Sequence, residues 1–333
     1  MAPFDQPTGK LDGAGLRVKE TNGRSRWSVG EALLEPCGAS SDEWAGENPL
    51  REKTTSLAVV PPLTDEFQSP AKPLTILVVE AHPDDAAFFA GGTLVKLAHE
   101  GHTIVDLIAT NGDKGTLDPK MTRTQVIKIR KDETRRAAQI LGVKEVLHLG
   151  MADGELEAGL ELRRKFTEVL RRVRPDLVFS FDPNCPYEPH PDHVATARSI
   201  YEACFTSHFH LYYPEHRAKG LQPHYVAKFY GWSSPNPNTY VDIGATLETK
   251  IKALEQYESQ MQMLLEENRH RLKLAGMEVP LLNQLDWREV VRLWVTLTAQ
   301  AAGKQSNHEF AEAFNVIPFG MVGVIADLLK ARP

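Results

Sequence analysis

The sequence predicts an α/β fold: a doubly wound, Rossmann-like, mostly parallel sheet with helices on both faces. From Leu74 onward, short apolar runs alternate with longer helical patterns, which is typical of strands separated by crossover helices. The runs at 74–81 and 176–181 are almost continuously apolar, as in strands buried on both faces. Polar clusters follow these runs, where such folds place their ligands.

The first half of the domain alternates strand and helix. Gly142 follows a long helical pattern and suits the left-handed conformation that commonly ends a helix, so we expect that helix to stop there. The expected elements are a strand, a helix, a strand, a polar loop and a helix, at 74–81, 86–100, Thr103–Ala109, Thr110–Lys120 and Thr122–Leu141.

The second half begins in the same way and then becomes less regular. Pro175 ends one helical pattern, because proline cannot continue a helix. After Tyr212 the alternation weakens, although helical periodicity returns. The expected strands are Glu145–Leu149, Asp176–Phe181 and Tyr225–Trp232. Two expected helices end near Val173 and Ser207. Two further helices are expected at Leu247–Ala275 and Trp287–Ala302.

Composition changes near residue 70. Residues 1–70 are rich in Gly, Ser, Pro and charge, so we expect a partly irregular N-terminal extension. Residues 71–333 are expected to form the main domain. Within it we expect a core at 74–210 and a C-terminal substrate-side region with helical additions at 211–333.

Charge and cysteine content exclude several classes of protein. The net charge of −6 gives no electrostatic case for nucleic acid as a partner. The three cysteines form no CxxC pair, which fits a cytoplasmic protein. No secretory signal and no apolar run of membrane-spanning length are present, so we expect no membrane partner. The sequence leaves a homo-oligomer open.

Four polar clusters are expected at the carboxyl edge of the predicted sheet. Ligands of doubly wound folds bind outside this edge, so the clusters predict one functional site. They are His82–Asp85, Thr110–Gly115, Met151–Gly154 and Asp182–His193.

Two of these clusters carry the residues of a metal site. We expect His82, Asp85 and His193 to bind one divalent metal, with water in the remaining position. Two histidines and a carboxylate form an open catalytic set for Zn²⁺, and the same set serves Fe²⁺ or another divalent metal. The alternative is that these residues cap helices and form turns, since Asp after Pro commonly begins a helix.

The neighbouring residues supply proton transfer. Asp84 lies beside Asp85 and is expected to accept a proton from metal-activated water, although it could instead be a helix N-cap. His190 is expected to act as general acid or oxyanion partner, with Asp192 fixing its orientation and raising its pKa. The alternative for His190 is a surface-loop histidine.

These motifs resemble a known family. Ala81-His-Pro-Asp-Asp85 with Gly91-Gly92, and Pro189-His-Pro-Asp-His193, are similar to the signatures of the PIG-L/LmbE-like zinc deacetylases, and the likeness extends over about residues 74–260. The resemblance implies the metal and proton-transfer roles given above. It also implies that Arg130 and Asp153 bind sugar hydroxyls, and for Arg130 the alternative is an exposed helix arginine.

The expected activity is therefore removal of an N-acetyl or similar acyl group from a small GlcNAc-type amino-sugar conjugate. A metallophosphoesterase is the alternative, but such sites usually hold two metals and need more carboxylates than we can place. A dinucleotide-binding module is a third reading. It is weakened because no GxGxxG follows the first strand.

Overall fold

A computed structural model describes residues 72–321 of the chain. The N-terminal extension expected at 1–70 lies outside the described residues, as do residues 322–333. Within the described part, no helix is both long enough and apolar enough to cross a membrane.

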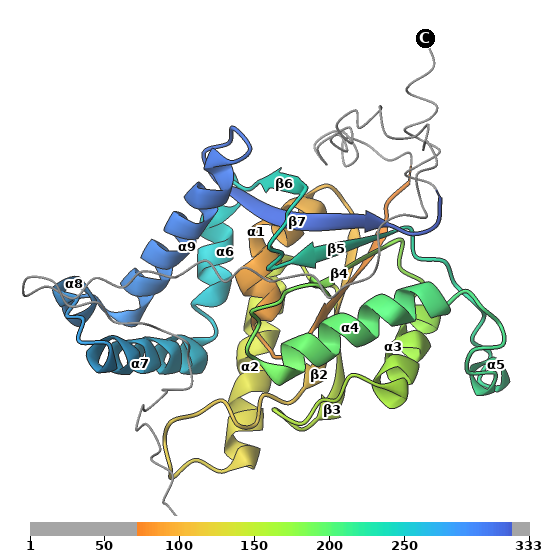
Figure 1. The fold of residues 1–333 in the computed structure, drawn as a ribbon, viewed down its shortest axis with the longest axis horizontal. Coiled ribbons are helices and arrows are strands. Elements are labelled where there is room, and N and C mark those ends of the chain that lie inside the picture. Colours follow the sequence, from red (N-terminus) through yellow and green to blue (C-terminus); the bar gives the residue numbers. More distant parts are fainter. Residues whose placement is uncertain (1–71, 322–333) are drawn as a thin grey trace, which may run out of the picture. The chain divides into compact units, whose positions relative to one another are not determined.

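The centre of the domain is a seven-stranded sheet (Figure 1) with the order β3-β2-β1-β4-β5-β7-β6. The five strands from β3 to β5 are parallel, and β7 is antiparallel to both β5 and β6. This confirms the predicted mostly parallel sheet. The strands are β1 Thr75–Glu80, β2 Thr103–Thr110, β3 Glu145–Met151, β4 Leu177–Phe181, β5 Lys228–Trp232, β6 Thr239–Asp242 and β7 Ala311–Pro318.

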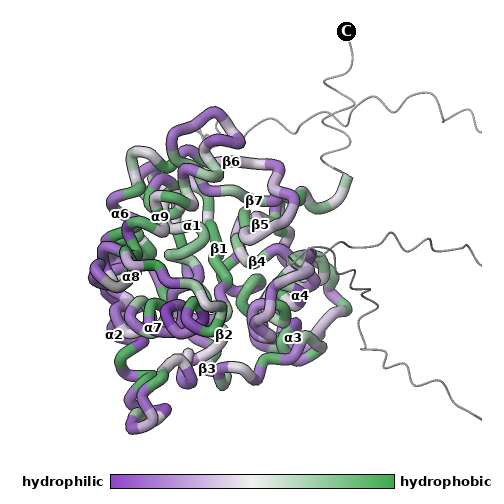
Figure 2. Tube along the Cα trace, turned by 60° about the vertical axis from the view of Figure 1, so that its left-hand side comes forward, coloured by the Kyte–Doolittle hydropathy of each residue, from purple (hydrophilic) through white to green (hydrophobic). Residues whose placement is uncertain are grey.

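Helices cover both faces of the sheet, as predicted. The core on one face includes side chains of α1, α2, α6, α7 and α9, and the core on the other face those of α3 and α4. Figure 2 shows the hydrophobic strand β1 between α1 and α4. The helices are α1 Asp85–His99, α2 Arg123–Leu141, α3 Leu160–Val173, α4 Pro191–Thr206, α5 Glu215–Ala218, α6 Leu247–Leu254, α7 Glu258–Leu274, α8 Pro280–Gln284 and α9 Trp287–Lys304.

Strands β1 and β4 are neighbours and buried along almost their whole length. Ile76 pairs with Leu177 and Val78 with Phe179 in parallel register. Because helices pack on both faces, the two strands need apolar side chains at successive positions and not only at alternate ones. This explains the continuous apolar runs in the sequence.

Helix α2 ends where the sequence predicts. Its N-cap, Thr122, forms a reciprocal capping box with Gln125, which satisfies backbone N–H groups at the helix start. Gly142 follows the last residue with φ of 75°, the left-handed conformation expected of a glycine C-cap.

The C-terminal part differs from the prediction in two ways. The single helix expected at Leu247–Ala275 is divided into α6 and α7, with the buried Tyr257 preceding α7. The strands β6 and β7 were not predicted, so the region expected to add helices also completes the sheet.

The buried carboxylate of Glu312 ties strand β7 to helices α6 and α1. Lys250 Nζ on α6 lies 2.6 Å from Glu312 Oε1 on β7, and both side chains are buried. The Glu312 carboxylate also accepts the backbone N–H groups of Gly92 and Thr93 in α1, at 2.9 and 2.8 Å. One carboxylate therefore joins β7 to the helix that begins at the carboxyl edge of the sheet.

The strand order reverses direction between β1 and β4. The chain moves outward from β1 to β2 and β3, and then returns to the other side of β1 to form β4. At such a reversal the loops leaving the two central strands diverge, and doubly wound folds bind ligands there.

Candidate active site

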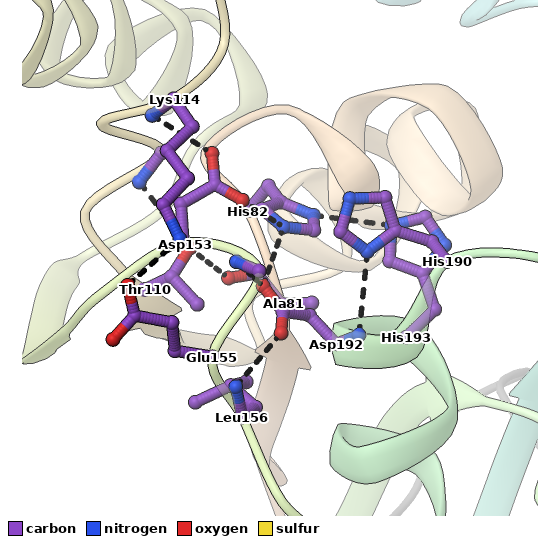
Figure 3. A network of polar contacts seen from close by, with 12 residues as sticks. Ala81, His82, Thr110, Lys114, Asp153, Glu155, Leu156, His190, Asp192 and His193 are labelled. Atoms are coloured by element: carbon purple, nitrogen blue, oxygen red, sulfur yellow. Dashed lines mark hydrogen bonds and ion pairs between the residues drawn. The ribbon is translucent and has the colours of Figure 1, made fainter.

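The two motifs that follow β1 and β4 meet beyond the ends of these strands. His82 and Asp85 lie at the end of β1 and the start of α1, and His193 lies in the first turn of α4. Nδ1 of His82 is 3.1 Å from Nε2 of His193, although 111 residues separate them. Figure 3 shows the His82 ring between the carboxylates of Asp153 and Asp192 and the rings of His190 and His193.

The three expected ligands lie close together, although Asp85 approaches the two histidines through different oxygens. Besides the 3.1 Å contact between the two histidines, Asp85 Oδ1 lies 3.4 Å from His193 Nε2, and Asp85 Oδ2 lies 3.7 Å from His82 Nδ1. Two ligand atoms that are each about 2.1 Å from a tetrahedral ion lie roughly 3.4 Å apart. The donor set therefore fits a single divalent metal ion.

Asp85 is held as a charged ligand. Its Oδ2 accepts the backbone N–H groups of Ala81 and His82, at 3.1 and 2.8 Å. Burial alone would raise its pKa, but the adjacent His193 and His82 outweigh burial and lower the pKa to about 2. The carboxylate therefore stays ionised near neutral pH.

Two further carboxylates contact the opposite side of the His82 ring. Nε2 of His82 lies 3.2 Å from Asp153 Oδ1 and 3.1 Å from Asp192 Oδ2. Burial acts to lower the pKa of His82, but these two carboxylates raise it to about 10. In a neutral ring, such as a bound metal would require, these carboxylates favour the proton on Nε2, and Nδ1 faces Asp85 and His193.

Two other groups of side chains bring three potential ligand atoms within 4.8 Å of one another: His82 with His190 and His193, and His82 with Asp153 and Asp192. The second group gathers on Nε2 of His82, away from the other histidines. The predicted set with Asp85 is distinct from both groups: Asp85 approaches His193 through Oδ1 and His82 through Oδ2, and Oδ2 is already held by two backbone N–H groups.

Asp84 does not act as a helix cap. It occupies the N-cap position of α1, but its side chain makes no capping hydrogen bond. Its φ of 148° and ψ of −21° are rare for a residue with a side chain, and strain of this kind often occurs at functional sites. The side chain instead lies 3.2 Å from the Arg130 guanidinium.

The environment of Asp84 suits a base that works near neutral pH. Burial raises its pKa from 3.8 to about 6, against the opposing effect of Arg130 and with a further increase from Asp85. A carboxylate with such a pKa is mostly ionised at pH 7 and still accepts a proton readily.

Arg130 is buried, with 2% of its surface exposed, so the exposed-helix alternative is wrong. It contacts Asp84 and donates to the carbonyl oxygen of Pro83, which fixes the turn between β1 and α1. Asp153 accepts the backbone N–H of Lys114 and contacts His82. Both expected sugar-binding residues thus lie against the catalytic groups.

His190 and Asp192 correct one expectation. The Asp192 carboxylate contacts His82 and accepts the N–H groups of Gly154 and Leu156, so it does not orient the His190 ring. Only the backbone N–H of Asp192 reaches His190, at Nδ1. Burial and the neighbouring histidines lower the pKa of His190, and their effect outweighs the increase that Asp192 causes.

His190 nevertheless lies within the histidine cluster. Its ring centroid is 4.4 Å from that of His82 and 4.7 Å from that of His193, and the ring is half-buried. Since Nδ1 accepts a hydrogen bond, the neutral ring carries its proton on Nε2. That N–H is available as a donor.

Sequence reasoning missed two side chains that hold His193. The ring of Phe181, the last residue of β4, stacks on His193 with 4.1 Å between centroids. Glu188 Oε1 lies 3.1 Å from His193 Nδ1. The only sequence signal for Glu188 is its nearness to the second motif. That signal is weak, because a single acidic residue in a loop is usually solvated.

Comparison with known proteins agrees with this geometry. Residues 77–204 match the PIG-L family model, described as GlcNAc-PI de-N-acetylase. A probable N-acetyl-alpha-D-glucosaminyl L-malate deacetylase 2 of Bacillus anthracis is 27% identical over 66% of this chain and 94% of its own length. The solved N,N'-diacetylchitobiose deacetylase of Pyrococcus horikoshii superposes with a TM-score of 0.65 at 29% identity, covering 76% of this chain and 87% of that one.

A further relative is matched over a larger share of this chain than the Bacillus protein. The diacetylchitobiose deacetylase of Thermococcus kodakarensis is 31% identical over 246 residues, which cover 73% of this chain and 83% of the relative. The matching sheet, the two motifs and this identity together show that the chain belongs to the PIG-L family.

Proposed function

We propose that this chain is a zinc-dependent N-deacetylase that hydrolyses the acetamide of a small GlcNAc-type conjugate. The observation that carries the proposal is the convergence of His82, Asp85 and His193, with the buried Asp84 beside them. The relatives named above are all deacetylases, and those whose names give a substrate act on GlcNAc-type sugars. The phosphoesterase alternative has no support among them.

A divalent ion bound by these residues would polarise the acetamide carbonyl and lower the pKa of water. Nitrogen donors from two histidines and one carboxylate suit Zn²⁺, the ion that we propose. Asp153 and Asp192 support this role, because they hold the His82 ring in the orientation that leaves Nδ1 free.

Asp84 is the proposed general base. It accepts the proton of the attacking water and then carries it toward the leaving nitrogen, so that the amine departs neutral. Arg130 limits the rise in the Asp84 pKa and fixes its position. Without this cation, the buried carboxylate would hold its proton at a higher pH.

His190 is the proposed oxyanion donor. In the neutral ring the proton lies on Nε2, which can donate a hydrogen bond to the oxygen that gains charge as the carbonyl is attacked. A lowered pKa suits this role better than that of a general acid, since a neutral ring donates a hydrogen bond without losing its proton. Arg130 and Asp153 remain the proposed contacts for sugar hydroxyls.

Acetate release tests this proposal. The purified full chain, stripped of metal and reloaded with one equivalent of Zn²⁺, should release equal amounts of acetate and free amine from N,N'-diacetylchitobiose or another GlcNAc conjugate. Asp84→Asn should bind the same amount of zinc but lose turnover, whereas Glu157→Gln, at an exposed position, should keep it. A zinc-loaded chain that releases no acetate from any member of such a panel would contradict the proposal.

A further inference from the structure

Glu188 lies in the loop between β4 and α4 and has no role in the mechanism above. Its carboxylate makes two contacts with the second motif. Oε1 lies 3.1 Å from Nδ1 of His193, and it accepts the backbone N–H of His190 at 3.0 Å. The side chain is only 14% exposed, so these contacts are not those of a solvated loop residue.

The two nitrogens of His193 face different partners. Nε2 faces His82 and Asp85, which makes it the atom that would bind the ion. Nδ1 is buried and has no aligned hydrogen bond among the described residues, although the Glu188 oxygen lies within reach. Phe181 stacks on the ring and limits its tilt.

A histidine that binds metal through one nitrogen keeps its proton on the other, and that N–H normally donates to a carboxylate or carbonyl. For His82 this partner is provided by Asp153 and Asp192, on the side away from the ion. Glu188 holds the corresponding position for His193. A small rotation of the imidazole or the carboxylate would align the 3.1 Å contact as a hydrogen bond.

The local sequence explains how a loop residue reaches this position. Glu188 and His190 each precede a proline, and residues before proline favour extended conformations. Side chains two residues apart in an extended segment point to the same side. Glu188 and His190 are therefore expected to project together toward the ring of His193.

We propose that Glu188 is a positioning residue for the metal site: it accepts the Nδ1 proton of His193 and so fixes the tautomer that leaves Nε2 for the ion. Through its bond to the His190 amide, the same carboxylate also sets the start of α4. This inference rests on the proposed metal ligation, but it does not depend on which substrate is hydrolysed.

Zinc affinity measured without substrate tests the role. The full-length wild type, Glu188→Ala, Glu188→Gln and the control Glu157→Gln would be titrated with zinc against a competing chelator. Loss of such a partner typically weakens metal binding about 10- to 100-fold, which we expect for Glu188→Ala. Glu188→Gln keeps an acceptor oxygen without the charge and should lose less, and the control should match the wild type.

The absorption spectrum of the Co²⁺-loaded proteins adds a second readout, because its bands respond to ligand geometry. We expect shifted bands for Glu188→Ala and unchanged bands for Glu157→Gln. Wild-type zinc affinity and an unchanged cobalt spectrum in both Glu188 variants would overturn the inference, even if turnover fell. If Glu188→Ala does not fold, the Gln variant decides by the same criteria.

The outcome is separable from that of the proposed function. A chain that releases no acetate but loses zinc affinity when Glu188 is changed would refute the deacetylase proposal alone. A wild type that deacetylates while its Glu188 variants bind zinc normally would refute the positioning role alone. A wild type that binds no zinc would refute both.

Discussion

Replacing Asp84 with Asn tests whether the protein keeps a buried charge for chemistry at a cost to its stability. Burial raises the pKa of Asp84 from 3.8 to about 6 despite the nearby Arg130. A carboxyl group whose pKa is higher in the folded than in the unfolded chain destabilises the fold once it ionises. The shift of roughly 2 pKa units corresponds to about 3 kcal/mol of lost stability at most.

The dependence on pH follows from the sign of the shift. Between about pH 4 and 6 the folded chain holds a proton that the unfolded chain has lost, so stability falls as the pH rises through this range. The loss is complete above pH 6 and absent below pH 4. Asn carries no charge, so metal-free Asp84→Asn should be more stable than the wild type at pH 7.5, and this advantage should shrink at pH 5.

Urea unfolding of the metal-free proteins at the two pH values measures the difference, and acetate release measures the catalytic effect. We expect Asp84→Asn to gain up to about 3 kcal/mol at pH 7.5 and to lose about 100- to 10,000-fold in kcat. A less stable variant at pH 7.5 would refute the reasoning about the buried charge. A fully active variant would refute the role of Asp84 as base.

Three further results are expected. Arg130→Met removes the cation that opposes the rise in the Asp84 pKa, so the rising limb of kcat/KM against pH should move to higher pH; an unmoved limb would contradict the assigned base. Lys250→Met leaves the Glu312 carboxylate buried without its cation and should cost about 3–5 kcal/mol in urea unfolding, whereas Arg292→Met, in an exposed pair, should cost under about 1 kcal/mol. Similar losses in the two variants would contradict the importance of burial. Zinc at 100 times its Kd should add about 2.7 kcal/mol to the stability of the metal-free chain, and the absence of any shift on chelation would argue against a bound ion.

The sequence was a good guide to the parallel half of the sheet. The apolar runs of β1 and β4 have a physical cause that can be read locally, because a strand covered on both faces needs apolar residues at consecutive positions. The position of His82 and His193 near one sheet edge follows from this, since His82 comes directly after β1 and His193 lies in the first turn of the helix that follows β4. The sequence predicts that the two rings lie near each other, but it does not predict the 3.1 Å between their nitrogens.

The C-terminal strands could not be predicted in the same way. Strand β7 reads Ala-Glu-Ala-Phe-Asn-Val-Ile-Pro and contains residues that do not favour strands. Its stability comes from pairing with β5, about 80 residues away, and from the buried bond between Glu312 and Lys250. The break between α6 and α7 contains neither Gly nor Pro, so no local signal marks it.

The partners of the site residues were the least predictable part. Asp192 was expected to serve its neighbour His190, but its carboxylate contacts His82, 110 residues away, and two amides of another loop. Arg130 is buried and not exposed on a helix, and its contact with Asp84 was not predicted. Sequence motifs identify which residues meet at a site, whereas side-chain pairing depends on how three loops pack.

The bond from Glu312 to the amides of Gly92 and Thr93 has a consequence for synthesis of the protein on the ribosome. A nascent chain already carries both histidine motifs long before residue 312 leaves the exit tunnel. Until then, the helix that starts beside Asp84 lacks its anchor on the last strand, and Lys250 lacks its counter-charge. The proposed site is therefore expected to gain this support only after residue 312 has emerged, although every proposed catalytic residue emerges earlier.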